Sequence, residues 1–551
     1  MAVHGPKQIS VLLRRVLLCA VFVFLYQGLL SAADVTLEWD ANTESDLKGY
    51  TVYYGHDSGQ YDHKIFVGNV TAYTVPDLDV GVYFFAVTAS DTSDLESWYS
   101  NEVFKVIPAQ TFYYPRASIV SSFTGIDVPV FTGIAFANPD VNPAAFEITA
   151  FDSSGNQVDD PGLTNPVVRM LGPGQQLTAI DAQWFGSSSA IDSIAYAKVD
   201  STTQISGLFE MFNSDLSILN GTDFASALTT SVFPTIAADG TRLQLVNANN
   251  SPQGVVFQLL DSQGGQLSSR WVLKHIAANA AIEIDPFSDL FPDASISGSE
   301  FIRVTAPLGV LPYAYLRGPG KSVQVFQGLD AAAGSTVLCA PEYAVGDNWW
   351  TTISVVNLHP DPDIVTFTFY PDGGGEPVSR LTYVDGFGKI EISDQSFFVS
   401  GDAASQKGYV SVTSNSVQLA GQVVFSDLNR QAFSAALPLV SSLSNSAFFS
   451  QAVSDETFYT GIAVVNPQDT PLNAVIRVYR SDGSSAATSN VLTIPARQRS
   501  VGMLADYFPD LGIQSSGYMT VEGDQGFASY VAFGTRDHTA LSALPGRQVK
   551  R

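Results

Sequence analysis

The sequence predicts an all-β protein made of tandem β-sandwich modules, and three observations support this fold class. The chain has 551 residues, whereas single hydrophobic cores stop growing at about 250–300 residues. It combines 45% hydrophobic with only 15% charged residues, and 44 Gly and 28 Pro interrupt short runs rich in Val, Ile, Phe and Tyr. This is the composition of short strands joined by tight turns. From about residue 112 onward a pattern recurs with a period near 110 residues, which suits a self-contained sandwich.

The N-terminal segment differs from the rest of the chain. Three basic residues precede an apolar run over residues 16–30, and Ser31 and Ala33 supply the small side chains that a signal peptidase requires. The run is shorter than the span of about 20 residues that a permanent membrane anchor needs. We therefore predict a cleaved signal peptide over residues 1–33 and an exported chain, extracellular, surface-bound or periplasmic, that begins at Asp34.

Residues 34–107 alternate apolar and polar side chains as strands do. Their anchors are Trp39, Tyr50, Leu78, Tyr83, Ser100 and Asn101. This set resembles the fibronectin type III family. The resemblance implies that the tryptophan packs between two sheets and that the corner tyrosine hydrogen-bonds to the backbone, so it assigns these residues structural roles.

Beyond this segment a strand followed by asparagine occurs four times. The asparagines are Asn138, Asn247, Asn357 and Asn466, spaced by 109, 110 and 109 residues. A glycine follows each of them by 17 residues, at Gly155, Gly264, Gly374 and Gly483. An aspartate just before each glycine indicates a tight hairpin turn with positive φ. The text of these repeats looks like β-sandwich repeats of exported bacterial proteins.

The repeats define four modules. We place them at residues 112–228, 233–330, 337–438 and 446–545. Each is large enough to bury its own core without disulfides, because Cys339 is the one cysteine left after removal of the signal peptide. We therefore expect each module to fold on its own.

The charge and the motifs exclude several functions. A formal net charge of −26 argues against binding nucleic acid, which requires a basic face. The sequence contains no nucleophile elbow, no His-Glu-x-x-His and no phosphate loop, so we predict neither catalysis nor a cofactor. His56 and His63 flank a predicted turn and are interpreted as turn residues, and Cys339 as a small buried hydrophobe.

Two groups of residues are candidate binding sites. Asp40, Asn42, Glu44 and Asp46 place oxygen ligands at alternate positions, as at the start of a calcium loop. They lack the central glycine and the distal glutamate, so the alternative is a turn between sheets. Trp349 and Trp350 precede the third repeated strand, and adjacent strand residues point to opposite faces. An outward ring can stack on a sugar, and the alternative is packing between modules.

Two functions remain open. The first is an exported, non-catalytic binding, adhesion or scaffold protein that presents its array to a polysaccharide or to an extracellular or envelope protein. The second is an accessory subunit of an extracellular polysaccharide hydrolase, or a cryptic hydrolase that uses paired carboxylates. A catalytic copy should hold polar residues that its sister repeats lack.

Overall fold

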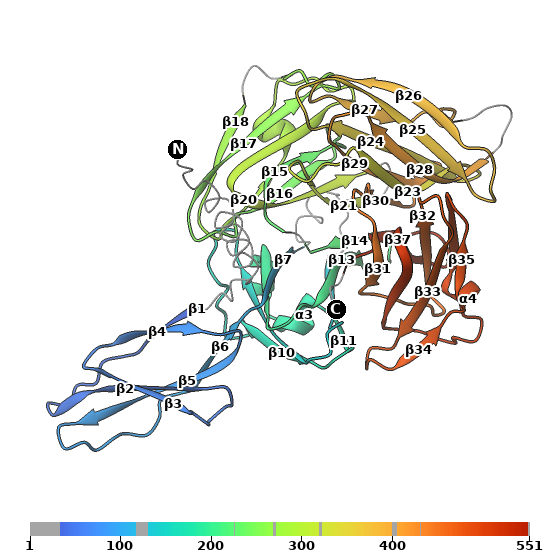
Figure 1. Cartoon of the computed structure of the whole chain (residues 1–551). Helices are drawn as coiled ribbons and strands as arrows, with labels where there is room; N and C mark the ends of the chain where they lie inside the picture. Colours follow the sequence, from blue (N-terminus) through green and yellow to red (C-terminus); the bar gives the residue numbers. More distant parts are fainter. Residues whose placement is uncertain are drawn as a thin grey trace, which may run out of the picture. The chain divides into compact units, whose positions relative to one another are not determined.

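The computed structural model describes residues 33–116, 130–224, 226–267, 271–318, 322–398, 405–429 and 431–548. The chain forms two compact units, residues 1–109 and 110–551, both built almost entirely of antiparallel strands (Figure 1). The predicted signal peptide up to residue 32 lies outside the described residues. Within the described part, no helix combines the length and apolar character needed to cross a membrane.

The first unit is a sandwich of two sheets. Its strands are β1 (Ala33–Glu38), β2 (Leu47–Gly55), β3 (His63–Gly68), β4 (Ala72–Leu78), β5 (Gly81–Asp91) and β6 (Val103–Ile107). β1 pairs with β4, and the second sheet has the order β3-β2-β5-β6. Leu37, Val52, Val75 and Phe85 come from both sheets and form the core. The alternation seen in the sequence thus buries one face of each sheet.

The second unit contains four repeats with the same topology. In repeat 1 the strands form two four-stranded sheets, of order β10-β9-β12-β7 and β11-β8-β13-β14, whereas in repeats 2, 3 and 4 shared or paired strands join the two equivalent sheets into one eight-stranded sheet. The strands of repeat 1 are β7 (Gln110–Pro115), β8 (Val130–Ala137), β9 (Ala144–Phe151), β10 (Val167–Leu171), β11 (Gln176–Ile180), β12 (Tyr196–Ser201), β13 (Ser206–Asn213) and β14 (Leu219–Asp223). The short helices α3 (Asp181–Phe185) and η1 (Ser189–Ser193) follow β11.

Repeats 2 and 3 reproduce this order. Repeat 2 contains β15 (Leu228–Phe233), β16 (Thr241–Val246), β17 (Gln253–Leu260), β18 (Val272–Ile276), β19 (Ala281–Ile284), the π-helix η2 (Pro286–Leu290), β20 (Phe301–Arg317), β21 (Val323–Gln327) and the short β22 (Leu329–Asp330). Repeat 3 contains β23 (Val337–Gly346), β24 (Trp349–Asn357), β25 (Asp363–Pro371), β26 (Val378–Val384), β27 (Lys389–Ile392), β28 (Ser405–Ser414), β29 (Leu419–Asp427) and β30 (Ser434–Pro438).

Repeat 4 completes the array. It contains β31 (Ser444–Phe449), β32 (Phe458–Asn466), β33 (Leu472–Tyr479), β34 (Ser485–Thr488), β35 (Leu492–Ile494), β36 (Gln498–Met503), α4 (Leu504–Tyr507), β37 (Tyr518–Thr535) and β38 (Leu541–Pro545). The long strands β20 and β37 each pair in both sheets of their repeat, where repeats 1 and 3 use two separate strands. The predicted tandem β-sandwich architecture is confirmed.

The repeated asparagine is a buried hydrogen-bonding hub. All four copies have an exposed fraction of 0%. In repeat 4 the Asn466 side-chain amide donates to the carbonyl oxygens of Thr470 at 2.8 Å and Pro495 at 3.0 Å. The other three make the corresponding pair of bonds. A buried amide that satisfies loop carbonyls explains why this residue recurs.

The repeated glycine serves both the turn and the contact with the next repeat. Gly155, Gly264, Gly374 and Gly483 have φ between +79° and +89°. A Cβ on Gly155 would lie 2.6 Å from the carbonyl oxygen of Ala278 in repeat 2. Gly264 in the same way abuts Gly386 of repeat 3, Gly374 faces Gln498 of repeat 4, and Gly483 abuts Gly174 of repeat 1. The contacts therefore form a closed cycle.

The cores of neighbouring repeats merge, which argues against the expectation that each module folds alone. One apolar cluster joins Phe209 of repeat 1 to Tyr313 of repeat 2, with their ring centroids 5.7 Å apart. Another joins Tyr530 of repeat 4 to Phe425 of repeat 3, and a third packs Leu208 of repeat 1 into the core of repeat 4. Residues 110–551 accordingly behave as one compact unit.

The last strand of every repeat meets its counterparts. β14 contacts β21 and β38, and β30 contacts β21 and β38. The Asn220 side chain accepts a hydrogen bond from the Val325 amide at 2.8 Å and donates to the Ser434 carbonyl oxygen at 2.9 Å. One buried side chain thus links repeats 1, 2 and 3. This link stabilises the contacts among the repeats at the centre of the cycle.

Candidate functional site

A groove of 610 Å³ opens in the first unit between the end of β1 and the segment that follows β5. Its floor consists of the core residues Leu37, Tyr50 and Phe85, which are almost fully buried. Its walls carry serine, threonine, asparagine and carboxylate side chains. An apolar floor with polar walls is the usual construction of a ligand site.

Two serines hold the wall of the groove against β5. The amide of Ser97 donates to the Ala89 carbonyl at 2.8 Å, and that of Ser100 donates to the Val87 carbonyl at 2.8 Å. Their hydroxyl oxygens accept from the amides of the same two β5 residues, at 3.0 and 3.1 Å. The hydrogen bonds of Ser97 and Ser100 therefore fix both ends of a short segment that contains Trp98 and Tyr99.

These two aromatic residues are both exposed but differ in their ring contacts. Tyr99 packs edge-on against Tyr53 and Tyr61, with ring centroids 5.0 Å away in each case. Burial and a hydrogen bond to Glu96 raise the pKa of Tyr53 to about 12, so its phenol stays neutral. Trp98 lines the groove and is 94% exposed. A large exposed aromatic ring on an anchored segment is typical of a ligand-binding surface.

The opposite wall carries Trp39. Its ring lies 5.5 Å from that of Tyr50, and its indole nitrogen is buried without a hydrogen-bond partner in the described structure. The exposed carboxylates of Glu38 and Asp40 also line the groove. The groove thus offers two indole rings, one unused donor and several acceptors.

The residues of the candidate calcium loop lie at the surface. Asp40, Asn42, Glu44 and Asp46 are all exposed, and the Asn42 amide donates to the Tyr50 hydroxyl at 2.6 Å. Across the described ranges, no three His, Cys, Asp or Glu side chains lie together as metal ligands would. The hydrogen bond ties the loop to the core, which is the role of a turn between sheets.

The tryptophan pair of repeat 3 does separate to opposite faces. Trp349 packs on Phe433 and Phe425, at centroid distances of 5.5 and 6.4 Å, and belongs to the core of repeat 3. Trp350 instead lines a pocket of 280 Å³ formed by residues of repeats 2 and 3, which we call the inter-repeat pocket. Neither ring lies on an open outer surface.

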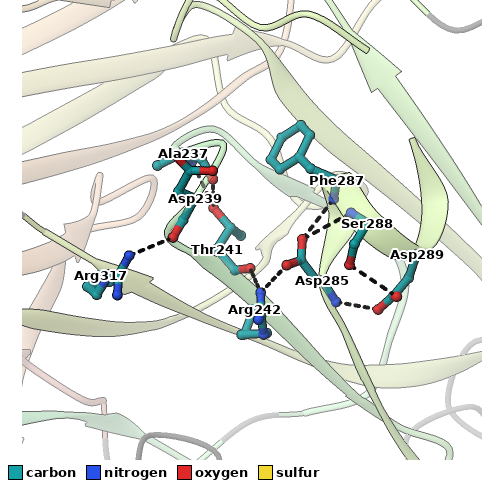
Figure 2. Close-up of polar contacts among 9 residues, drawn as sticks. All are labelled: Ala237, Asp239, Thr241, Arg242, Asp285, Phe287, Ser288, Asp289 and Arg317. Atoms are coloured by element: carbon teal, nitrogen blue, oxygen red, sulfur yellow. Dashed lines mark hydrogen bonds and ion pairs between the residues drawn. The ribbon is translucent and has the colours of Figure 1, made fainter. Parts of the chain in front are cut away.

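The wall of the inter-repeat pocket from repeat 2 is held by a polar network (Figure 2). Ala237 lines the pocket, and its carbonyl accepts from the Thr241 hydroxyl at 2.9 Å. Arg317 also lines it and donates to the Asp239 carbonyl at 3.1 Å. Beside them Arg242 forms an ion pair with Asp285, which caps the start of η2. Hydrogen bonds and an ion pair within repeat 2 therefore hold this wall of the pocket in place.

The remaining reactive residues lie apart from both cavities. The His56 imidazole contacts the Val82 carbonyl and stacks near Tyr83, and His63 stacks on Tyr54. Burial raises the pKa of the Cys339 thiol to about 12, so the thiolate nucleophile is absent at neutral pH. These placements agree with the turn and core interpretations.

Sequence reasoning missed Trp98. A large aromatic residue within the otherwise polar run Asp94-Leu95-Glu96-Ser97-Trp98 is a detectable signal. Its meaning depends on whether the ring is buried, and adjacent Tyr99, which carries the same signal, is the one that packs.

Comparisons with known proteins give weak likenesses. No family model and no curated protein matches the chain. Among solved structures, a tetra-tandem repeat in the extending region of a large adhesion protein is 12% identical, covers 75% of this chain and 96% of that one, and has a TM-score of 0.12. The α-L-rhamnosidase of Dictyoglumus thermophilum is 11% identical over 78% of this chain and 48% of its own, with a TM-score of 0.16. A Bacteroides ovatus protein of a mixed-linkage glucan utilization locus, SGBP-B, is 11% identical over 70% and 93%, with a TM-score of 0.10. TM-scores this low give no basis for transferring a ligand or an activity.

Proposed function

We propose that this chain is an exported, non-catalytic binding protein that holds a neutral polysaccharide in the groove of its first unit. The observation that carries the proposal is Trp98, an almost fully exposed ring on a segment fixed by Ser97 and Ser100. A ring carried by a backbone segment that is already fixed stacks on a sugar face without the cost of ordering that segment.

The polar groups of the groove suit hydroxyl-rich ligands. Trp39 lines the groove, and its buried indole N–H has no hydrogen-bond partner in the described structure. Glu38 and Asn101 on the walls offer acceptors for sugar hydroxyl protons. A net charge of −26 repels polyanions at moderate ionic strength, so the proposal is restricted to neutral polymers.

The second unit provides the scaffold in this proposal. Its closed cycle of repeat contacts joins the repeats into one large compact body. We assign the first unit to the fibronectin type III family on its Trp39, Tyr50 and Tyr83 anchors and its two-plus-four strand arrangement. The proposal of export rests on the sequence pattern of residues 1–33.

Affinity electrophoresis of residues 34–551 against neutral glucans, xylans and galactans tests the proposal. We expect retardation by at least one polymer, and Trp98→Ala should weaken it about 30-fold, the effect of losing a hot spot of about 2 kcal/mol. Leu95→Ala is the matched control, because Leu95 is 71% exposed in the same segment but does not line the groove.

Three outcomes contradict the proposal. The first is that no neutral polymer is retained, and the second is that Trp98→Ala and Leu95→Ala behave alike. The third is that a retained polymer is cleaved and Glu38→Gln abolishes the release of reducing ends, which would favour the hydrolase.

A further inference from the structure

The inter-repeat pocket contains buried polar atoms with no partner. Gln324 is 6% exposed, and its amide nitrogen donates to the Ser434 hydroxyl at 2.6 Å. This bond fixes the amide and leaves its carbonyl oxygen without a partner, as the Thr235 hydroxyl also is, and both residues line the pocket. A buried polar group without a partner costs free energy unless something bonds to it.

The pocket is also unlike its counterparts. Trp350 pairs across the strands with Ser426 in repeat 3. Strand pairing also identifies the equivalent pair in each of the other repeats. The corresponding pairs are Phe131 with Phe212 in repeat 1 and Tyr459 with Gly534 in repeat 4. In repeat 2, Gly240 lies opposite Arg317. Repeat 3 alone of these pairs joins an aromatic ring to a hydroxyl.

The carboxylate that lines the pocket is already paired. Glu391 lines it and pairs with Lys389 at 3.0 Å. The Lys389 ammonium also donates to the carbonyls of Pro234 and Glu300 in repeat 2. The Arg317 guanidinium donates to the backbone carbonyl oxygen of Asp239, as Figure 2 shows, and this bond holds it against repeat 2. The groups left to contact a ligand are an aromatic ring, an amide oxygen and hydroxyls, which favours a neutral, hydroxyl-rich molecule.

We propose that the inter-repeat pocket binds one neutral, pyranose-sized sugar unit. Trp350 lies against the sugar ring, Gln324 accepts a proton from one sugar hydroxyl, and Thr235 and Ser426, which both line the pocket, bond to others. A volume of 280 Å³ is just below the range of about 300–1,000 Å³ of sites for drug-sized ligands, so it accommodates one sugar unit and not a chain. This site is separate from the groove of the first unit and does not depend on it.

The test uses residues 34–551 with Trp98→Ala, so that the groove cannot supply the signal. D-glucose, D-galactose, D-mannose and D-xylose are titrated into the millimolar range, with saturation-transfer NMR and the thermal midpoint as readouts. We expect at least one sugar to bind. Thr235→Val and Ser426→Ala should each weaken binding roughly tenfold, the effect of losing one hydrogen bond.

Thr178→Val is the matched control, because Thr178 lines the corresponding pocket between repeats 4 and 1. It should leave sugar binding unchanged. The proposal fails if none of the sugars binds, or if Thr178→Val weakens binding as much as Thr235→Val does. It also fails if sodium sulfate displaces the sugar at equal concentration, which would identify an anion site. Ser426→Ala keeps the test decisive if Thr235→Val does not fold.

Discussion

At the scale of single residues, Glu210 is the least expected feature of the second unit. Its side chain is 6% exposed at the junction of repeats 1 and 4, where the Gln451 amide donates to it at 3.4 Å. Burial raises its pKa to about 7, against the lowering effects of Ser542 and Gln451. The carboxyl is therefore protonated below neutral pH, when a buried charge would otherwise be left without a cationic partner.

This raised pKa predicts a pH-dependent stability. The folded state holds the Glu210 proton more tightly than the unfolded state does, so the free energy of unfolding should fall as pH rises from about 4.5 to about 7. The loss should reach about 3 kcal/mol and then stay constant. Glu210→Gln should remove this slope and be more stable than the wild type at pH 8, as measured by urea unfolding. Exposed Glu376→Gln is the control, and equal slopes in wild type and Glu210→Gln would show that Glu210 does not titrate as argued.

At the scale of elements, the glycine turns show how one residue satisfies two constraints. Gly264 has φ of +79°, and a Cβ there would lie 2.3 Å from the Gly386 carbonyl oxygen of the next repeat. Gly373 has the same φ but nothing within 4 Å of such a Cβ. Substitutions at these two positions therefore distinguish the cost of backbone strain from the cost of disturbing the packing between repeats.

We expect Gly373→Ala to cost about 1 kcal/mol, the usual effect of a side chain at positive φ. Gly264→Ala should cost about 2 kcal/mol more, because its Cβ collides with a backbone carbonyl that cannot rotate away. Chemical denaturation of both variants measures the difference. Equal losses of unfolding free energy in the two variants would mean that the junction between repeats 2 and 3 accommodates the added Cβ at no cost.

At the scale of the whole molecule, the closed cycle makes the repeats interdependent. Gln176 of repeat 1 donates to the Ser450 and Gly517 carbonyls of repeat 4, at 2.6 and 2.7 Å. Arg499 of repeat 4, whose side chain is 3% exposed, pairs with Glu342 and Asp372 of repeat 3. Every repeat therefore has two faces that are buried only in the complete array.

Interdependence predicts that repeat 4 does not fold alone. Residues 441–551 by themselves would expose Tyr530, Leu541 and Ala543, which are buried with repeat 3, and such apolar surface favours aggregation. We expect this fragment to lack a cooperative melt by circular dichroism, whereas residues 110–551 unfold in one transition. A cooperative melt of the fragment near the midpoint of residues 110–551 would restore the picture of independent modules.

The sequence by itself determined the all-β class, the four repeats and the Asn and Gly positions, because strand alternation and turn chemistry depend on neighbouring residues. It also placed Trp349 and Trp350 on opposite faces. The closing of the cycle, the exposure of Trp98 and the pocket beside Trp350 were decided only by the tertiary structure. They depend on contacts such as that between Gln176 and Ser450, which lie 274 residues apart, and no local pattern records which distant surfaces meet.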